Sequence, residues 1–210
     1  MRCGRASPDD AEKVSNGACG GAVLAAAAGA GAAFLLRSST YTPTIEIPGE
    51  NVLPDFTLVD QYGRDFRLSS LKGRVVLIYF GYTHCPDVCP LVLTKYKQIL
   101  ASLGSDADKI ALIFVTVDPE RDTVEVMRRY LSYYSERIIG LTGEPDKVAE
   151  VLEKYNVYVA KEEPDASGNY LVDHFALVMG ADRNLVLRVA FTPEMSLEEY
   201  LDGVRYLLSK

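Results

Sequence analysis

The stretch VVLIYFGYTHCPDVCP, residues 75–90, decides which fold the sequence can adopt. Its first six residues form an unbroken apolar run, which is typical of a central strand buried on both faces of a sheet. Cys85 and Cys89 follow in a turn that is rich in proline, and helical apolar spacing continues over residues 91–103. The stretch therefore predicts a buried strand, a turn that carries two thiols, and a helix.

The segments around this unit alternate between strand and helix patterns. A second apolar run covers residues 110–117, and helical patterns cover residues 123–134 and 144–155. A hairpin signal, QYGR between FTLVD and DFRLS, precedes the unit, and two paired strand patterns with a final helix opened by Ser196 end the chain. This alternation predicts an α/β fold with a central sheet flanked by helices and an N-terminal hairpin.

The N-terminal part has a different composition from the rest. No charged residue lies between Lys13 and Arg37, and Ala and Gly dominate the segment. Residues 14–37 are long enough to cross about 30 Å of hydrocarbon, so we interpret them as a single transmembrane helix. A cleaved signal peptide and a buried helix are the alternatives. Two of the four cysteines, Cys3 and Cys19, fall in this part of the chain and are not expected to belong to a site.

Basic residues set the expected orientation of this anchor. Three of them precede the apolar segment and only Arg37 follows it closely, so the positive-inside rule places residues 1–13 in the cytoplasm. We then expect an extended linker over residues 38–51 and a folded domain over residues 52–210. The domain would face the extracytoplasmic side of the cell membrane.

The overall charge limits the classes of partner. The chain carries a formal net charge of −7, with 29 acidic against 22 basic residues. Such a surface disfavours the phosphate backbone of nucleic acids. We therefore expect no nucleic acid partner.

Two thiols at a strand end can form a disulfide, exchange disulfides with a partner, or hold a soft metal. If the segment is helical, a spacing of four places the two Cα atoms roughly 6 Å apart, from a rise of about 1.5 Å per residue. A disulfide between Cys85 and Cys89 is possible at that distance. A purely structural disulfide remains an alternative, although so short a loop stabilises little. Structural zinc is disfavoured because it requires four ligands and the sequence offers three.

His174 is the expected third ligand. It stands in LVDHFALVMG, at the start of an apolar strand that we expect to lie beside the cysteine-bearing strand. Two thiolates and one imidazole form a soft, low-coordinate set that suits Cu(I) and can accept Cu(II). His84 is the competing nitrogen, but it neighbours Cys85 along the backbone and should point elsewhere, so we expect it to support the site or contact a partner.

Two aspartates follow the second buried strand. Asp118 ends this strand at the same sheet edge as the cysteines, so we expect it to orient a ligand or to contact a partner, a simple turn before Pro119 being the alternative. Asp122, with Glu125 three residues later, predicts the N-cap of the next helix.

The sequence resembles the Sco/SenC family of copper-binding proteins. The resemblance rests on GYTHCPDVCP, on VTVDPERDT at residues 115–123 and on VDHF at residues 172–175, in that order. It implies a thioredoxin-like fold tethered to a membrane and copper held by Cys85, Cys89 and His174. Residues 161–170 resemble the hairpin that this family inserts near the site. The family commonly has a small hydroxyl residue where this chain has Phe175, which leaves the subfamily open.

The resemblance also implies a function and its partners. It points to a metallochaperone that takes copper from an upstream donor and delivers it to the CuA centre in the copper-bearing subunit of cytochrome c oxidase. The alternative is a membrane-anchored thiol-disulfide oxidoreductase that reduces cysteines of the oxidase or of another target, and a copper or redox sensor is a third possibility. We favour a protein that is not an enzyme, because thioredoxin-type oxidoreductases carry CxxC and a proline where this chain has Asp173 and His174.

Overall fold

The apolar run of residues 75–80 lies at the centre of an eight-stranded sheet in the computed structural model, which describes residues 45–210. The strands of this sheet are β1 (Glu46–Val52), β2 (Thr57–Asp60), β3 (Asp65–Arg67), β4 (Val75–Gly81), β5 (Ile110–Thr116), β6 (Ile138–Thr142), β9 (Val178–Ala181) and β10 (Val186–Phe191). The helices are α2 (Val88–Leu103), α3 (Val124–Ser132), α4 (Pro145–Lys154) and α5 (Leu197–Leu208), with the 3-10 turns η1 (Leu68–Leu71) and η2 (Gly104–Lys109).

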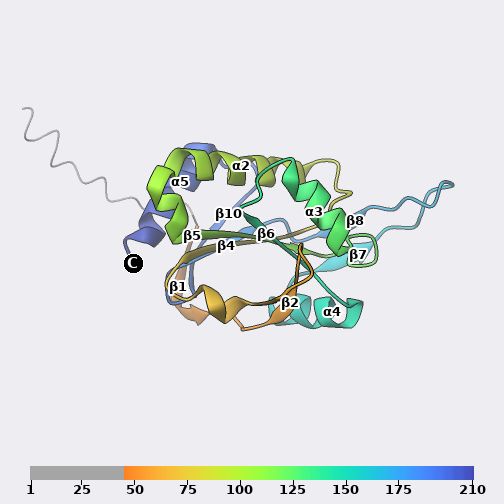
Figure 1. Cartoon of the computed structure of the whole chain (residues 1–210), viewed down its shortest axis with the longest axis horizontal. Coiled ribbons are helices and arrows are strands. Elements are labelled where there is room, and N and C mark those ends of the chain that lie inside the picture. Colours follow the sequence, from red (N-terminus) through yellow and green to blue (C-terminus); the bar gives the residue numbers. More distant parts are fainter. Residues whose placement is uncertain (1–44) are drawn as a thin grey trace, which may run out of the picture. The chain divides into compact units, whose positions relative to one another are not determined.

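The order of strands across the sheet is β1-β10-β9-β4-β5-β6-β2-β3. β4, β5 and β6 are parallel neighbours, and the remaining pairs are antiparallel. Every residue of β4 and β5 is buried, because α2, α3 and α5 cover one face of the sheet and α4 covers the other (Figure 1). Strands buried on both faces must be apolar throughout, which explains the two unbroken runs in the sequence.

The predicted α/β fold is thus confirmed, including the hairpin of β2 and β3. Of the two predicted helix N-caps, one was confirmed and one was wrong. Ser196 caps α5 and forms a capping box with Glu199, as predicted. The prediction for α3 was wrong: Thr123, not Asp122, is its N-cap, and its hydroxyl accepts a hydrogen bond from the amide of Val126. Asp122 is fully buried, and its carboxylate accepts hydrogen bonds from Thr83 and Thr116 instead.

The predicted linker ends earlier than expected. Residues 46–51 were assigned to it, but they belong to β1, which pairs antiparallel with β10 at one edge of the sheet. Pro48 and Gly49 interrupt any alternating pattern there, and the pairing register shifts between Glu46 and Asn51. An irregular edge strand of this kind has little sequence signature.

The predicted transmembrane helix at residues 14–37 lies outside the described residues. Among residues 45–210, no helix combines the length and the apolar character that crossing a membrane requires.

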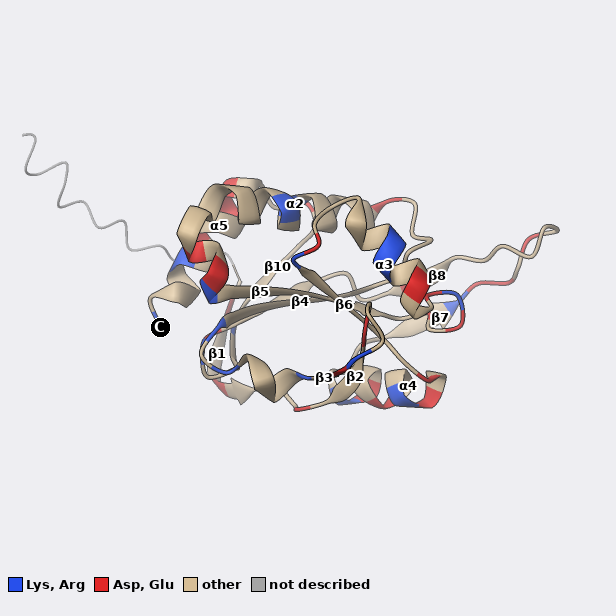
Figure 2. Ribbon diagram, viewed as in Figure 1, with Lys and Arg blue, Asp and Glu red and all other residues tan. Residues whose placement is uncertain are grey.

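A second, two-stranded sheet stands apart from the main one. Its strands are β7 (Val159–Lys161) and β8 (Val172–His174), and they pair antiparallel, with Val159 opposite His174. The connection between them is the predicted polar excursion. It extends outward as a long arm whose ribbon is coloured for acidic residues in places (Figure 2). Its sequence contains Glu162, Glu163 and Asp165. The two strands of this hairpin do not pair with the main sheet, although Val172 of β8 is buried in the hydrophobic core.

Candidate metal centre

The two thiols lie at the carboxyl end of β4. Cys85 is in the loop between β4 and α2, where its amide donates a hydrogen bond to the carbonyl of Tyr82, and Cys89 is the second residue of α2. Cys85 is 8% exposed and Cys89 is fully buried. Both are free thiols in this structure. One sulfur therefore lies near the surface and the other beneath it.

The structure brings His174 to these thiols. Its Nε2 lies 3.7 Å from the Sγ of Cys89, and the ligand atoms of Cys85, Cys89 and His174 all lie within 4.8 Å of one another. The strand assignment of His174 was wrong, however. It ends β8 in the small sheet, while β9, the strand that pairs with β4, begins four residues later.

The donor set fits one soft metal ion. In zinc sites, metal–sulfur and metal–nitrogen bonds are about 2.3 Å and 2.0 Å, so three such donors around one ion lie roughly 3.5–4 Å apart. The 3.7 Å between the Sγ of Cys89 and the Nε2 of His174 falls in this range, and no two of the three donor atoms are more than 4.8 Å apart. Cys and His donors in a low-coordinate group select copper or zinc over hard ions such as magnesium. Among residues 45–210, this is the one group of three or more metal-ligating side chains close enough to share an ion.

The two thiols have different acidities. A hydrogen bond from Cys89 stabilises the thiolate of Cys85 and outweighs its burial, and His174 and the backbone amides of Cys89 and Asp87 add to the effect, so that the pKa of Cys85 is lowered. Burial, with the negative charge of Cys85 beside it, raises the pKa of Cys89. Cys85 is therefore the more acidic thiol of the pair.

Two tyrosines form an aromatic wall around the imidazole. The rings of Tyr79 and Tyr82 meet His174 edge to face, with centroids 6.1 Å and 5.7 Å away. The hydroxyl of Tyr79 lies 3.5 Å from the Sγ of Cys89, and the hydroxyl of Tyr82 accepts a hydrogen bond from the amide of Val172. Both rings are buried, so they fix the orientation of the imidazole by packing.

Gly81 leaves room for the buried thiol. A Cβ atom at this position would lie 2.7 Å from the Sγ of Cys89 and 2.8 Å from the ring of Phe114. Real side chains do not approach so closely, and therefore only glycine fits where β4 passes under the sulfur.

The cysteine-bearing loop is anchored by Asp122. Its buried carboxylate accepts hydrogen bonds from the amide and the hydroxyl of Thr83, at 3.0 and 2.6 Å, and from the hydroxyl of Thr116 at 2.7 Å. Burial raises the pKa of this carboxyl group, although the threonine hydrogen bonds oppose the shift. Asp122 thus ties the turn after β4 to the end of β5.

Asp118 and His84 do not reach the thiols. The carboxylate of Asp118 is fully buried, where it accepts hydrogen bonds from Arg121 and Tyr170. The imidazole of His84 is exposed and lies 3.0 Å from the hydroxyl of Thr83 and 3.7 Å from the carboxylate of Asp122. Of the two histidines, only His174 can share an ion with both cysteines.

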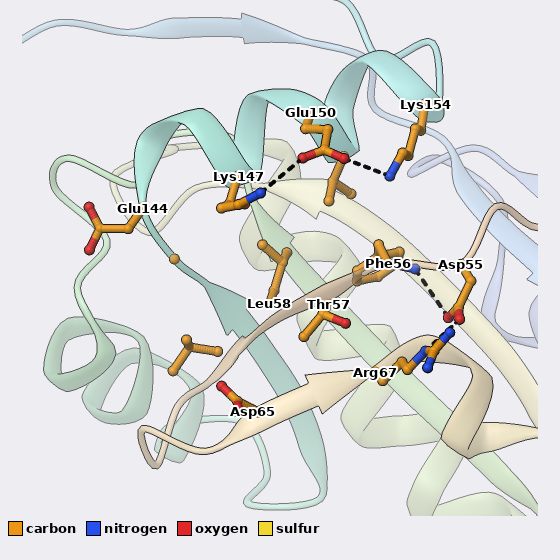
Figure 3. Close-up of a pocket in the computed structure, with 13 residues that line it drawn as sticks. Asp55, Phe56, Thr57, Leu58, Asp65, Arg67, Glu144, Lys147, Glu150 and Lys154 are labelled. Carbon is orange, nitrogen blue, oxygen red and sulfur yellow. Dashed lines mark hydrogen bonds and ion pairs between the residues drawn. The ribbon is translucent and has the colours of Figure 1, made fainter.

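A separate hollow of about 510 Å³ lies between β2 and α4 (Figure 3). Charged side chains surround its mouth, including Asp55 paired with Arg67, and Glu150 placed between Lys147 and Lys154. Neither cysteine nor His174 lines it. Most of the charged side chains that line this hollow thus pair with one another.

Several residues of the site gave no clear signal in the sequence. Tyr79 looks like any apolar core position, and Tyr170 like one polar residue of a loop. Gly81, directly before the turn, was the one available hint, because glycine at the end of a buried strand often marks a close approach.

Comparison with known proteins gives a consistent result. The SCO1/SenC family model matches residues 46–209. A SCO2-like protein of Rickettsia conorii is 34% identical over 192 residues, which cover 87% of this chain and 93% of that protein.

Solved structures agree with this match. The structure of Bradyrhizobium japonicum ScoI with copper bound has a TM-score of 0.69 at 41% identity, and the match covers 74% of this chain and 99% of that one. The structure of yeast Sco1 with copper bound has a TM-score of 0.69 at 31% identity, covering 76% of this chain and 90% of that one.

Proposed function

Because this chain belongs to the SCO1/SenC family, we propose that it is a copper metallochaperone, which carries the ion on Cys85, Cys89 and His174 and delivers it to the CuA centre of cytochrome c oxidase. The copper would be cargo, received from an upstream donor and passed on. The family resemblance supports the choice of oxidase as the recipient, and the copper-bound relatives support the choice of ion.

One observation carries the proposal: three soft donors converge within 4.8 Å of one another, although 85 residues separate Cys89 from His174. The set contains two sulfurs and one nitrogen, which suits Cu(I). Three ligands also leave the ion open to a fourth donor. A carrier needs such an opening, because a closed four-ligand site is typical of structural metals.

The burial of the donors suggests an order of release. Cys85 is nearly buried and His174 is half-buried, whereas Cys89 is fully buried beside Tyr79. A donor atom of the recipient can approach only from the exposed side. It would therefore displace His174 and Cys85 first, and Cys89 would let go of the ion last.

Thiol oxidation would control loading. Metal binding requires deprotonated thiols, so a disulfide between Cys85 and Cys89 would exclude copper. The domain would accept the ion only in its reduced form.

A second candidate function, thiol-disulfide exchange, has an observation in its favour. The lowered pKa of Cys85 and the buried, protonated Cys89 are the arrangement that dithiol exchange uses. The Cys85 thiolate would attack a partner disulfide, forming a mixed disulfide and releasing one partner thiolate, which takes the proton of Cys89. The Cys89 thiolate would then attack the Cys85 sulfur and break the mixed disulfide, releasing the second partner sulfur as a thiolate that water protonates. The partner would gain two thiols, and this domain would hold the disulfide.

The test of copper binding is a titration of the reduced full chain with Cu(I) under anaerobic conditions, followed by X-ray absorption. We expect one ion per chain with two sulfur ligands and one nitrogen ligand. His174→Ala should lose the nitrogen, whereas His84→Ala, the matched control, should retain full affinity because His84 bonds to Thr83 and Asp122 and does not belong to the donor group. Full-affinity binding by His174→Ala would show that His174 is not a copper ligand.

A second experiment separates the two functions in cells that depend on this protein. If copper delivery is the task, Cys85→Ser, Cys89→Ser and His174→Ala should each lower oxidase activity at low copper, and added copper should restore part of it. If thiol exchange is the task, only the cysteine variants should fail, because exchange needs no third donor. Near-normal oxidase activity with His174→Ala at low copper would reject the metallochaperone.

The location of the domain belongs to the same proposal. Delivery to this oxidase centre would require the thiols to face the extracytoplasmic side, with residues 14–37 as the membrane anchor. Reporter fusions placed after Arg37 should be active only outside the cytoplasm. Reporter activity found only in the cytoplasm would contradict the proposed orientation.

A further inference from the structure

Two segments that lie far apart in the sequence meet beside the metal centre. One is the loop after β5, with Asp118 and Arg121, and the other is the β7–β8 hairpin, which begins its return strand near Tyr170 and ends it at His174. A two-stranded hairpin is at best marginally stable by itself. Something other than the main sheet must therefore hold the strand that carries the imidazole.

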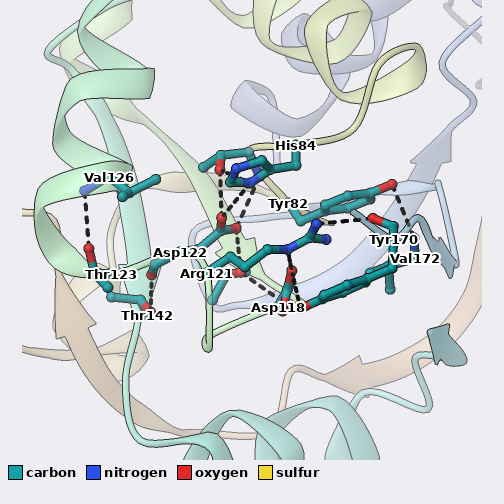
Figure 4. Close-up of polar contacts among 12 residues, drawn as sticks. Tyr82, His84, Asp118, Arg121, Asp122, Thr123, Val126, Thr142, Tyr170 and Val172 are labelled. Carbon is teal, nitrogen blue, oxygen red and sulfur yellow. Dashed lines mark hydrogen bonds and ion pairs between the residues drawn. The ribbon is translucent and has the colours of Figure 1, made fainter. Parts of the chain in front are cut away.

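Arg121 is at the centre of this contact. Its guanidinium carbon lies 3.5 Å from the ring centroid of Tyr170 and 5.7 Å from that of Tyr82, so that it is placed between the two rings (Figure 4). Its Nη1 donates a hydrogen bond to the carbonyl of Tyr170 at 3.0 Å, and its Nε pairs with the buried carboxylate of Asp118. The Arg121 side chain is only 20% exposed, so solvent screens these contacts weakly.

Tyr170 completes the contact from the hairpin side. Its hydroxyl donates to both carboxylate oxygens of Asp118, at 3.0 and 3.2 Å. Lys161, on the other strand of the hairpin, lies 3.9 Å from the same carboxylate and pairs with Glu120 at 2.7 Å. The end of β7 and the residues just before β8 are thus both attached to the loop after β5.

Tyr82 connects this contact to the imidazole. Its hydroxyl accepts a hydrogen bond from the amide of Val172, and its ring packs edge to face on His174 with centroids 5.7 Å apart. The Tyr82 ring also contacts the guanidinium of Arg121. A displacement of Arg121 or Tyr170 would therefore reach His174 through the hairpin backbone and through this buried ring.

We propose that Arg121 and Tyr170 are positioning residues of the metal centre: they clamp the β7–β8 hairpin to the loop after β5, and so set whether His174 reaches Cys85 and Cys89. The proposal rests on the proposed function only in naming His174 as a copper ligand. Asp118 provides the carboxylate to which both residues bind. Asp122 anchors the thiols from the same loop, so one loop holds both halves of the site by separate contacts.

Four variants of the full chain, purified in mild detergent, test the clamp. Arg121→Ala removes the guanidinium, Tyr170→Ala removes both ring and hydroxyl, and Tyr170→Phe keeps the ring over Arg121 but loses the bond to Asp118. The matched control is Arg188→Ala, because Arg188 also pairs with a buried carboxylate, that of Asp182, in the turn between β9 and β10. Its stability loss should be similar without any contact to the hairpin.

Two readouts distinguish positioning from simple stability. In the copper-free protein, the NMR signals of the His174 imidazole and the exchange rates of the β7–β8 amides report the hairpin directly. In the Cu(I)-loaded protein, X-ray absorption counts the nitrogen ligand, and competition with a chelator gives the affinity. We expect Arg121→Ala and Tyr170→Ala to shift the His174 signals, to lose the nitrogen ligand and to weaken binding about 10- to 100-fold, as supporting partners of metal ligands do. Tyr170→Phe should lie between these variants and the unaltered chain.

The outcomes are separable. Unchanged His174 signals and amide exchange in Arg121→Ala and Tyr170→Ala would overturn the clamp, as would an equal loss of the nitrogen ligand in Arg188→Ala, which would point to general instability. If the unaltered chain binds no Cu(I), the proposed function fails, while the signals of the copper-free variants still decide whether the clamp positions His174.

Discussion

Gly81 and Cys89 approach so closely that a methyl group on Gly81 would lie 2.7 Å from the sulfur of Cys89. The same methyl group would lie 2.9 Å from the ring of Tyr79, whose hydroxyl contacts that sulfur. The backbone at the end of β4 thus packs directly against the buried sulfur of the metal centre. Because Gly81 has no side chain, the buried thiol of Cys89 fits against this strand.

We expect Gly81→Ala to destabilise the domain by about 1–3 kcal/mol, the usual cost of overpacking a core, and to displace Cys89. Urea unfolding measures the first effect and Cu(I) affinity the second. Gly140→Ala is the matched control, because its added methyl would collide with Leu131, away from the thiols. It should lose stability but keep copper affinity. Unaltered affinity in Gly81→Ala would show that the thiol does not need this space.

Asp122→Ala should destabilise the domain by about 2–4 kcal/mol, because it leaves the amide of Thr83 and two threonine hydroxyls without their buried acceptor. Asp122→Asn should cost less, since its carbonyl oxygen can accept part of the same bonds. Hydrogen exchange of the Thr83 amide should accelerate in both. Asp108→Ala, which removes an exposed pair with Arg137, should cost no more than about 1 kcal/mol. Equal losses in the Asp122 and Asp108 variants would contradict the anchoring role.

The stability of the domain should depend on pH through Asp182. Burial opposes ionisation of this carboxyl group, but Arg188 and the amides of Val186 and Asn184 outweigh it, so its pKa is lowered. A lowered pKa stabilises the fold above the unfolded value of about 3.9, and that contribution disappears as the pH falls through the folded value.

The free energy of unfolding of the unaltered chain should therefore exceed that of Asp182→Asn by a constant amount from pH 7 to about pH 5. The difference should shrink between about pH 4 and pH 3. Asn keeps an acceptor for the two amides and removes the titration, which makes it the appropriate comparison. A difference that grows as the pH falls would reverse the sign of the effect.

Alkylation of the reduced, metal-free chain should modify Cys85 before Cys89. Cys85 is nearer the surface and has the lowered pKa, whereas Cys89 is fully buried with a raised pKa. Peptide mapping by mass spectrometry separates the two sites from Cys3 and Cys19. In urea, where burial is lost, the two rates should converge. Equal labelling in the folded protein would show that the structure does not distinguish the thiols.

The elements that the sequence predicted well are those with strong local patterns. The apolar runs of β4 and β5, the β2–β3 hairpin and the capping box at Ser196 each depend on neighbouring residues, so they can be recognised in one window of sequence. β1 was missed because Pro48 and Gly49 break its alternation, and its partner β10 lies at the other end of the chain.

Two errors near the site have a similar cause. Asp122 and Thr123 are both good helix caps, and only the burial of Asp122 against Thr83 and Thr116 decides that the threonine performs the role. The apolar residues after His174 predicted one strand, but the chain forms β8 in one sheet and β9 in another. Neither choice is encoded in local residue spacing.

The sequence by itself determined the chemistry of this protein. Two cysteines in a strand-to-helix turn and a histidine in VDHF identify soft donors, because donor chemistry is a property of residue type. The sequence also favoured His174 over His84 as the third donor. Only the tertiary structure decided that the strand carrying His174 lies in a separate hairpin, that Gly81 makes room for Cys89, and that Arg121 and Tyr170 hold this hairpin. The hairpin contacts join residues far apart in the chain, and the close approach of Gly81 to Cys89 depends on how β4 and α2 pack, so local sequence patterns reveal neither.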